Sequence, residues 1–244
     1  MIREQDIPWG ELGLARLDAE RRRRFGLAWS SRMNQEHLAV GAFAILTQEL
    51  AEDGCDPIVL EMIAKASSDE VRHARICRRL AVAALGESEV TPLLRGVPSV
   101  PKYADAPRTL RALYHVVEMC CLNETFTGVY LTEMHARATD PAARAAVDSL
   151  LADEIGHGRA GWAYLATRKG DPALDALAKE LPALVDRSMS AVARAAKQHP
   201  EADDPALEAF GWLGSAAATA IYEQTLRDVI MPGFESLGIV IDAR

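Results

Sequence analysis

The sequence predicts an all-α protein, a four-helix bundle with one long crossover loop that is followed by about two additional C-terminal helices. Three observations predict this fold. Hydrophobic residues make up 49% of the chain, and Gly and Pro fall mainly between long Ala- and Leu-rich stretches. Asp-Pro precedes four of these stretches, at 56, 140, 171 and 204, and Asp as the cap with Pro at the first helical position is typical of a helix start. No stretch requires a strand, and we expect residues 1–244 to form a single domain.

The periodicity places the helices in order along the chain. We expect them at about 18–52, 57–85, 107–138, 141–169, 172–198 and 205–231. The first four would form the bundle, at 18–169, and the last two a helical extension within 172–244, with Pro182 as the place where the fifth helix would break. Only 87–106 is a long connection, and about 20 residues can span about 60 Å, more than the about 45 Å of a helix of about 30 residues. This loop can therefore join two antiparallel hairpins into one bundle.

The composition argues against several classes of function. A formal net charge of -8 and a pI near 5.3 argue against a nucleic-acid partner, which requires clustered positive charge. The first nine residues lack the apolar segment of a secretory signal, and no apolar run reaches the about 20 residues of a membrane span. We therefore expect a cytoplasmic protein with no membrane partner. The four cysteines form no CxxC pair, which excludes a zinc knuckle or a rubredoxin-type iron site.

A repeated motif is the most specific feature of the sequence. Residues 69–75 read DEVRHAR and residues 153–159 read DEIGHGR, so each of two helices carries Asp-Glu with a His three positions after the Glu. The preceding helix of each hairpin carries one further glutamate, Glu36 or Glu124, which lies 34 or 30 residues before the glutamate of the motif. All four glutamates lie about 20–24 Å from the turn of their hairpin. We therefore expect them in one layer of the bundle.

Each of these carboxylates interrupts an apolar stripe. The stripes are Trp29, Met33, Glu36, Val40, Phe43 and Leu50 in the first helix; Ile63, Ala66, Glu70, His73, Cys77 and Leu80 in the second; Leu113, Val117, Cys121, Glu124, Gly128 and Leu131 in the third; and Val147, Leu151, Glu154, His157, Gly161 and Leu165 in the fourth. Residues three apart share a helix face, so the Glu and His of each motif can bind the same metal. Four buried carboxylates would repel one another and lose hydration, so cations must compensate them.

Two divalent metal ions would supply that charge. The predicted ligands are Glu36, Glu70, His73, Glu124, Glu154 and His157. Carboxylate and imidazole ligands suit iron, with manganese as the alternative. Asp69 and Asp153 are expected to accept hydrogen bonds from the ligand histidines and so to fix their rings.

The order Glu, ExxH, Glu, ExxH resembles the ferritin-like di-iron carboxylate superfamily over residues 18–169. This resemblance implies a ferritin-like bundle whose six ligands hold two iron ions. The chain departs from individual members: it lacks the CxxC motifs of rubrerythrins and continues beyond the fourth helix of bacterioferritins. Cys77 stands where ribonucleotide reductase small subunits commonly place a radical Tyr, and Leu150 where arylamine N-oxygenases have an extra His. DEVRH is similar to the DExRH of bacterial multicomponent monooxygenases, whereas DEIGH is not.

The resemblance implies a non-haem di-iron oxidase or oxygenase that uses O₂ to oxidise a small organic substrate. One alternative is a ferroxidase or rubrerythrin-like peroxidase without an organic substrate. Another is a tRNA-modifying di-iron hydroxylase, which would need a basic face. A purely structural helical protein would bind no metal. An external electron donor and assembly as a homodimer stay open.

Two small residues mark a candidate substrate pocket in the third helix. Gly128 follows Glu124 by one turn on the ligand face, and Cys121 precedes it by about one turn. Small side chains there would leave space beside the metals. The alternative is that they only permit close helix packing, which also favours small residues.

Overall fold

The computed structural model describes residues 3–90, 103, 105–198 and 203–239, and within these ranges the secondary structure is entirely helical. The prediction of an all-α fold is confirmed. The main helices are α1 (Ala19–Asp53), α2 (Pro57–Leu85), α3 (Arg108–Val116), η5 (Val117–Glu124), α4 (Thr125–Arg137), α5 (Pro141–Thr167) and α6 (Ala173–Gln198). The C-terminal part contains α7 (Pro205–Glu208), α8 (Ser215–Thr225), η6 (Leu226–Ile230) and α9 (Met231–Ser236). Short 3-10 turns are η1 (Glu4–Asp6), η2 (Trp9–Glu11), η3 (Leu14–Arg16) and η4 (Glu87–Glu89).

Aspartate caps begin several of these helices, as the sequence predicts. Asp56 accepts from the backbone amides of Ile58 and Val59 at the start of α2. Asp140 and Asp204 do the same for α5 and α7. Each cap satisfies amides that have no partner within their own helix. Gly54 ends α1 at a φ of 72°, a conformation that glycine adopts without strain.

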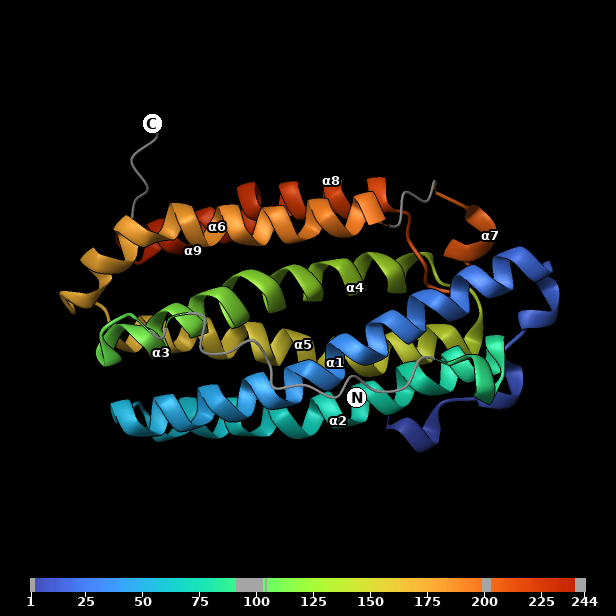
Figure 1. Cartoon of the computed structure of the whole chain (residues 1–244), viewed down its shortest axis with the longest axis horizontal. Coiled ribbons are helices and arrows are strands. Elements are labelled where there is room, and N and C mark those ends of the chain that lie inside the picture. Colours follow the sequence, from blue (N-terminus) through green and yellow to red (C-terminus); the bar gives the residue numbers. More distant parts are fainter. Residues whose placement is uncertain (1–2, 91–102, 104, 199–202, 240–244) are drawn as a thin grey trace.

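The long helices run alongside one another in pairs (Figure 1). α1 and α2 form an antiparallel hairpin, and α3, η5 and α4 continue as one rod that pairs with α5. α5 also packs against α2, so the two pairs share an interior. α6 and α8 lie on the other side of the α3–α4 rod from α1 and α2 (Figure 1). Most of the predicted crossover loop, 91–102 and 104, lies outside the described residues.

Two helices differ from the sequence prediction. The helix expected at 107–138 is not α-helical throughout, because η5 is a π-helix whose turns contain more residues than α-helical turns. The helix expected at 205–231 is interrupted, because α7 ends at Glu208 and Gly211 adopts a φ of 71° before α8 begins. Pro182 lies inside α6 without breaking it.

The buried apolar side chains form two clusters that follow one another along the helices. The α3-end cluster includes Phe43, Leu46, Ile63, Ala66, Leu113, Leu122, Ala160 and Leu165. The α4-end cluster includes Phe25, Trp29, Met33, Ile76, Leu80, Leu131, Val147 and Leu150. Between their buried members lie 34–42 in α1, 67–75 in α2, 123–130 in the rod and 151–159 in α5. These four segments bring polar side chains into the interior.

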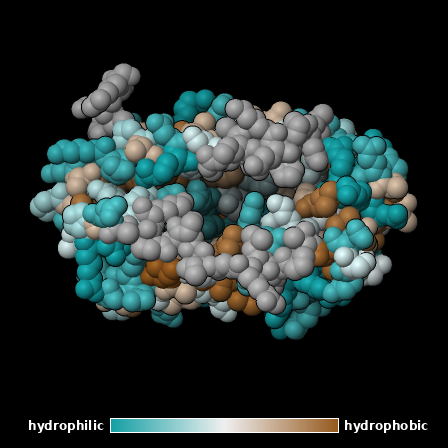
Figure 2. All heavy atoms as spheres, viewed as in Figure 1, coloured by the Kyte–Doolittle hydropathy of each residue, from teal (hydrophilic) through white to brown (hydrophobic). Residues whose placement is uncertain are grey.

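The face of the molecule in Figure 2 carries mainly hydrophilic residues, with smaller apolar patches between them. Only a few large apolar side chains are exposed among the described residues, such as Ile58 and Val229. Within the described part of the chain, no helix combines the length and the apolarity needed to cross a membrane.

Candidate metal centre

The six predicted ligands all lie in the segments between the two apolar clusters. Glu36 comes from α1, Glu70 and His73 from α2, Glu124 from the end of η5, and Glu154 and His157 from α5. Five of them are buried, and Glu124 is partly exposed. The expected common layer of acidic side chains is therefore present.

These residues form two overlapping groups of donor atoms. Glu36, Glu70, His73 and Glu154 make one group, and Glu70, Glu124, Glu154 and His157 make the other. Within each group, the donor atoms lie within 4.8 Å of one another. Glu70 and Glu154 belong to both groups, whereas Glu36 and Glu124 each belong to one. The sequence placed the glutamates in one layer but did not indicate which two would be shared.

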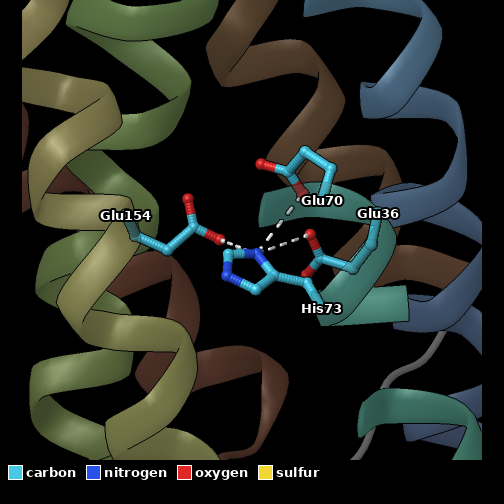
Figure 3. A group of neighbouring side chains, drawn as sticks. All are labelled: Glu36, Glu70, His73 and Glu154. Atoms are coloured by element: carbon cyan, nitrogen blue, oxygen red, sulfur yellow. Dashed lines mark ion pairs between the residues drawn. The ribbon is translucent and has the colours of Figure 1, made fainter. Parts of the chain in front are cut away.

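Both imidazoles direct the same nitrogen toward the carboxylates. His73 Nδ1 lies 3.4 Å from Glu70 Oε2, 3.5 Å from Glu154 Oε1 and 3.8 Å from Glu36 Oε2 (Figure 3). His157 Nδ1 lies 3.2 Å from both Glu70 Oε1 and Glu154 Oε2. Each group therefore places one imidazole nitrogen among carboxylate oxygens, a donor set suited to iron or manganese.

The outer nitrogens face Asp69 and Asp153 in a crossed arrangement. His157 Nε2 lies 3.4 Å from Asp69 Oδ2, and His73 Nε2 lies 3.5 Å from Asp153 Oδ2. Each aspartate thus faces the histidine of the other motif. A carboxylate at this position favours a proton on Nε2 and leaves Nδ1 available to a metal. The predicted role of the two aspartates is consistent with these contacts.

Two basic side chains hold the aspartates. Lys65 Nζ lies 2.5 Å from Asp69 Oδ2 and 3.2 Å from Asp153 Oδ1. Arg72 pairs with Asp153 and donates to Ser149 Oγ at 2.7 Å. Gly156, which occupies the place of Arg72 in the second motif, has no side chain to do the same. The surroundings of the two rings therefore differ, with Asp153 the more strongly anchored aspartate.

Without metal ions, protons on the ligand side chains balance part of the negative charge of the four glutamates. Although burial disfavours the charged ring, contacts with Asp69, Glu154 and Glu70 raise the pKa of His157 to about 12. The pKa of His73 is also raised despite burial, since Asp153 and Glu154 face its ring. Burial and the neighbouring Glu154 raise the pKa of Glu70 to about 7. Protons on the inward nitrogens therefore stand where a cation could bind.

Unsatisfied buried atoms supply an independent test of the fit. Glu70 Oε2 and both ring nitrogens of His73 are buried and have no hydrogen-bond partner of acceptable geometry among the described residues. Buried polar groups without partners are costly, and a metal ion would satisfy the inward-facing ones. The residues present therefore fit a pair of metal ions held by carboxylates and imidazoles.

Arg32 is a member of the site that the sequence analysis missed. Its Nε atom lies 2.6 Å from Glu36 Oε1, and its Nη2 atom lies 3.6 Å from Glu154 Oε1. An Arg four positions before a Glu is common on exposed helix surfaces, so this spacing gave no signal. Trp29 and Met33 lie on either side of Arg32 in sequence and are both buried, which is the one clue that the chain offers.

The two small residues of the predicted pocket have different surroundings. Cys121 is fully buried in the α3-end cluster, and its Sγ atom would lie 3.0 Å from a Cβ added to Gly161. A Cβ added to Gly128 would lie 3.9 Å from Ile155, an ordinary contact. Cys121 thus takes part in close helix packing, while Gly128 has room for a methyl group.

His115 is buried but does not belong to either group of donor atoms. Its Nδ1 atom lies 2.5 Å from Glu49 Oε2, and its ring packs against Tyr103. Tyr103 in turn donates to Glu118 and accepts from Arg187. This polar cluster joins α1, α3, η5 and α6 near the end of the α3–α4 rod.

Comparisons with protein-family profiles, with curated protein sequences and with solved structures give no match to this chain. The assignment of function therefore depends on the chemistry of the site.

Proposed function

We propose that α1, α2, α5 and the α3–α4 rod form a ferritin-like four-helix bundle, and that the chain is a non-haem di-iron oxidase or oxygenase. In this proposal it uses O₂ to oxidise a small organic substrate. The observation that carries it is the pair of donor groups sharing Glu70 and Glu154. Each group adds one further carboxylate and one imidazole to the two shared carboxylates: Glu36 and His73 in one group, Glu124 and His157 in the other. This arrangement suits two adjacent ions rather than one.

Charge supports two divalent ions. Glu36, Glu70, Glu124 and Glu154 would contribute four negative charges, which two divalent cations balance. Metal binding would displace the protons from the inward nitrogens, because only a deprotonated ring can donate its lone pair. Two ferrous ions held there would supply electrons for the reduction of O₂. Manganese is the alternative for the same donor set.

The protein's own groups have separate tasks in this proposal. Asp69 and Asp153 hold the imidazoles in a fixed orientation, and the apolar clusters on both sides exclude water. Glu124 is the ligand with the greatest exposure, so it lies at the edge of the site.

The first experiment measures metal content. After anaerobic loading with Fe(II), the protein should hold about two ions per chain, and a Glu70→Ala, Glu154→Ala double variant should lose both because each residue serves both groups. A Glu61→Ala, Asp148→Ala double variant changes carboxylates on the same two helices outside the donor groups and should keep the metal. Full iron in the Glu70, Glu154 variant would refute the site.

The second experiment separates the functions. The reduced, iron-loaded protein is mixed with O₂ and followed by stopped-flow absorption, with and without candidate organic substrates. An oxidase or oxygenase should show a reaction that such a compound alters. A reaction indifferent to every compound, with ferric oxide accumulating, would favour a ferroxidase. A dependence on H₂O₂ in place of O₂ would favour a peroxidase.

A further inference from the structure

Arg32 places a permanent positive charge beside the candidate metal centre. Its side chain is 16% exposed and contacts Glu36 and Glu154, which belong to the donor groups. A guanidinium stays protonated at all physiological pH values. The contact with Glu36 is ionic only, because Arg32 Nε is buried and lacks a hydrogen-bond partner of acceptable geometry among the described residues. The donor capacity of Arg32 is therefore not fully used by the two glutamates.

The charge balance changes when metal binds. Two divalent cations would neutralise the four glutamates, and Lys65 and Arg72 already balance Asp69 and Asp153. Arg32 then becomes the excess positive charge of the loaded site. A buried charge without compensation is unfavourable, so the loaded site would gain from one negative charge supplied by a ligand.

Among the described residues, the ion pairs of Arg32 are those with Glu36 and Glu154. Its strongest interactions beyond the two glutamates are with Cys77 on α2 and Tyr130 on α4. Burial raises the pKa of the Cys77 thiol and of the Tyr130 phenol, so both are neutral at pH 7. Among the described groups whose charge acts most strongly on Arg32, Glu36 and Glu154 are therefore the anions, and Cys77 and Tyr130 are neutral.

Aromatic side chains continue from this point along α4. The ring of Tyr130 lies 5.8 Å from that of Phe126, which lies 4.7 Å from the ring of Tyr222 on α8. A guanidinium that acts on the neutral Tyr130, with further aromatic rings beyond it, matches a ligand with one carboxylate and an apolar body. Guanidinium groups bind carboxylates through two parallel hydrogen bonds, which makes Arg more specific for them than Lys.

We propose that Arg32 binds the carboxylate of a small organic acid and so selects a monocarboxylate as the substrate class of this site. The proposal rests on the metal centre proposed above, since metal ions must first occupy Glu36 and Glu154. Arg32 then turns from a counter-ion of the two glutamates into the binding group for the acid. In this role it is a specificity-determining residue.

The test uses the full chain loaded anaerobically with Fe(II), and isothermal calorimetry with acetate, butyrate and benzoate as probes. We expect at least one carboxylate to bind the loaded protein and benzamide, the neutral analogue of benzoate, to bind at least tenfold more weakly. The metal-free protein should bind these acids weakly because Arg32 is still paired with Glu36 and Glu154. Because linkage is reciprocal, the acid that binds should also tighten metal binding by the same factor.

The variants separate a specific role from a structural one. Arg32→Gln should keep both metal ions and lose about 10-fold to 100-fold in affinity for the acid, in keeping with the strength of a charged hydrogen bond. Arg32→Lys, which keeps the charge but not the fork, should lose less and remains informative if the Gln variant does not fold. Arg22→Gln, an exposed change on the same helix, should behave as the wild type.

Several results would overturn the inference while leaving the metal centre intact. These are loaded protein that binds no acid of the series, equal affinity for benzoate and benzamide, or undiminished acid binding in both Arg32 variants. Loss of metal in the wild type itself would instead refute the function proposed above. The two failures are therefore distinguishable from the metal content.

Discussion

Asp69 on α2 contacts His157 on α5, with 3.4 Å between Oδ2 and Nε2, rather than the histidine of its own motif. Asp153 on α5 contacts His73 on α2 in the same way, at 3.5 Å. Each motif therefore places a carboxylate beside the outer ring nitrogen of the other, and the two helices must pack together before either ring has this neighbour. This reciprocity explains why the aspartate belongs to both copies of the repeat.

The first prediction follows from the unequal anchoring of these aspartates. Asp153→Asn should weaken metal binding about 10-fold to 100-fold, because an amide removes the negative charge that faces His73 Nε2 and leaves Arg72 without its ionic partner. Asp69→Asn should weaken it less, since Asp69 is more exposed and pairs with Lys65 alone. Competition titrations against a metal-sensitive dye measure both affinities.

The control for that pair is Asp148→Asn, on α5 but at the surface, where its nearest basic group is His135 at 3.8 Å. This variant should bind metal as the wild type does. Equal affinities in Asp153→Asn and the control would show that the outer contact of His73 does not orient the ring.

The layer of ligands was predictable from the sequence because it depends only on register. Carboxylates in apolar stripes, at matched distances from two hairpin turns, can occupy only one level of a bundle. The sharing of Glu70 and Glu154 depends instead on side-chain torsions and on helix rotation, which spacing does not reveal. For the same reason the crossed contacts of Asp69 and Asp153 were not foreseen.

Other features lay outside what periodicity can show. The π-helical turns before Glu124 were not predicted, because a sequence pattern assumes a constant number of residues per turn. In the sequence, Gly211 looks like a small residue inside the helix expected at 205–231, but its positive φ interrupts that helix. Arg32 resembles a surface residue in sequence because burial of its helix face is a tertiary effect.

The second prediction concerns pH. In the metal-free protein the folded-state pKa of His157 is raised to about 12, so its stabilising contribution is full below its unfolded pKa near 6.5 and declines as pH rises above that value. The pKa of Glu70 is raised from 4.5 to about 7. Its contribution to the stability of the metal-free protein therefore also declines as the pH rises from 4.5 to about 7. Metal binding must displace protons from the rings, so metal affinity should rise with pH.

Consequently the increase in Tm caused by metal should grow between pH 6 and pH 8. Thermal unfolding with and without Fe(II) or Mn(II) measures it. Calorimetry in two buffers of different ionisation enthalpy should detect the release of about two protons from the imidazoles, together with the part of a proton that Glu70 carries near neutral pH. A metal-induced shift that shrinks over this range would contradict the protonation of the two imidazoles.

The third prediction compares two buried glycines on facing helices. A Cβ at Gly161 would lie 2.5 Å from Cys120 Cβ and 3.2 Å from the backbone nitrogen of Cys121, so Gly161→Ala should cost about 1–3 kcal/mol through overpacking. A Cβ at Gly128 meets only Ile155 at 3.9 Å, so Gly128→Ala should be neutral or stabilising by up to about 1 kcal/mol. Urea unfolding of both metal-free variants measures the difference. Equal effects would mean that the helices are not as closely packed at Gly161 as described.

The last prediction concerns Asp140, which has two roles at the start of α5. Its fully buried carboxylate caps the amides of Ala142 and Ala143 through Oδ1 and accepts from Gly13 N at 2.9 Å and from Arg16 at 2.5 Å through Oδ2.

Asp140→Ala removes both roles and should lower the free energy of unfolding by about 2–4 kcal/mol, of which the cap contributes about 1 kcal/mol and the charged hydrogen bonds from Gly13 and the exposed Arg16 the rest. Asp56, an exposed residue, supplies the same type of cap to α2 without a distant partner, so Asp56→Ala should cost only about 1 kcal/mol. Denaturant unfolding of the two variants isolates what the contact with the N-terminal segment adds, because the caps are alike. Since α5 carries Glu154 and His157 well beyond its first turn, both variants should still bind about two metal ions when folded. Equal losses of stability would show that Gly13 and Arg16 add nothing to the cap.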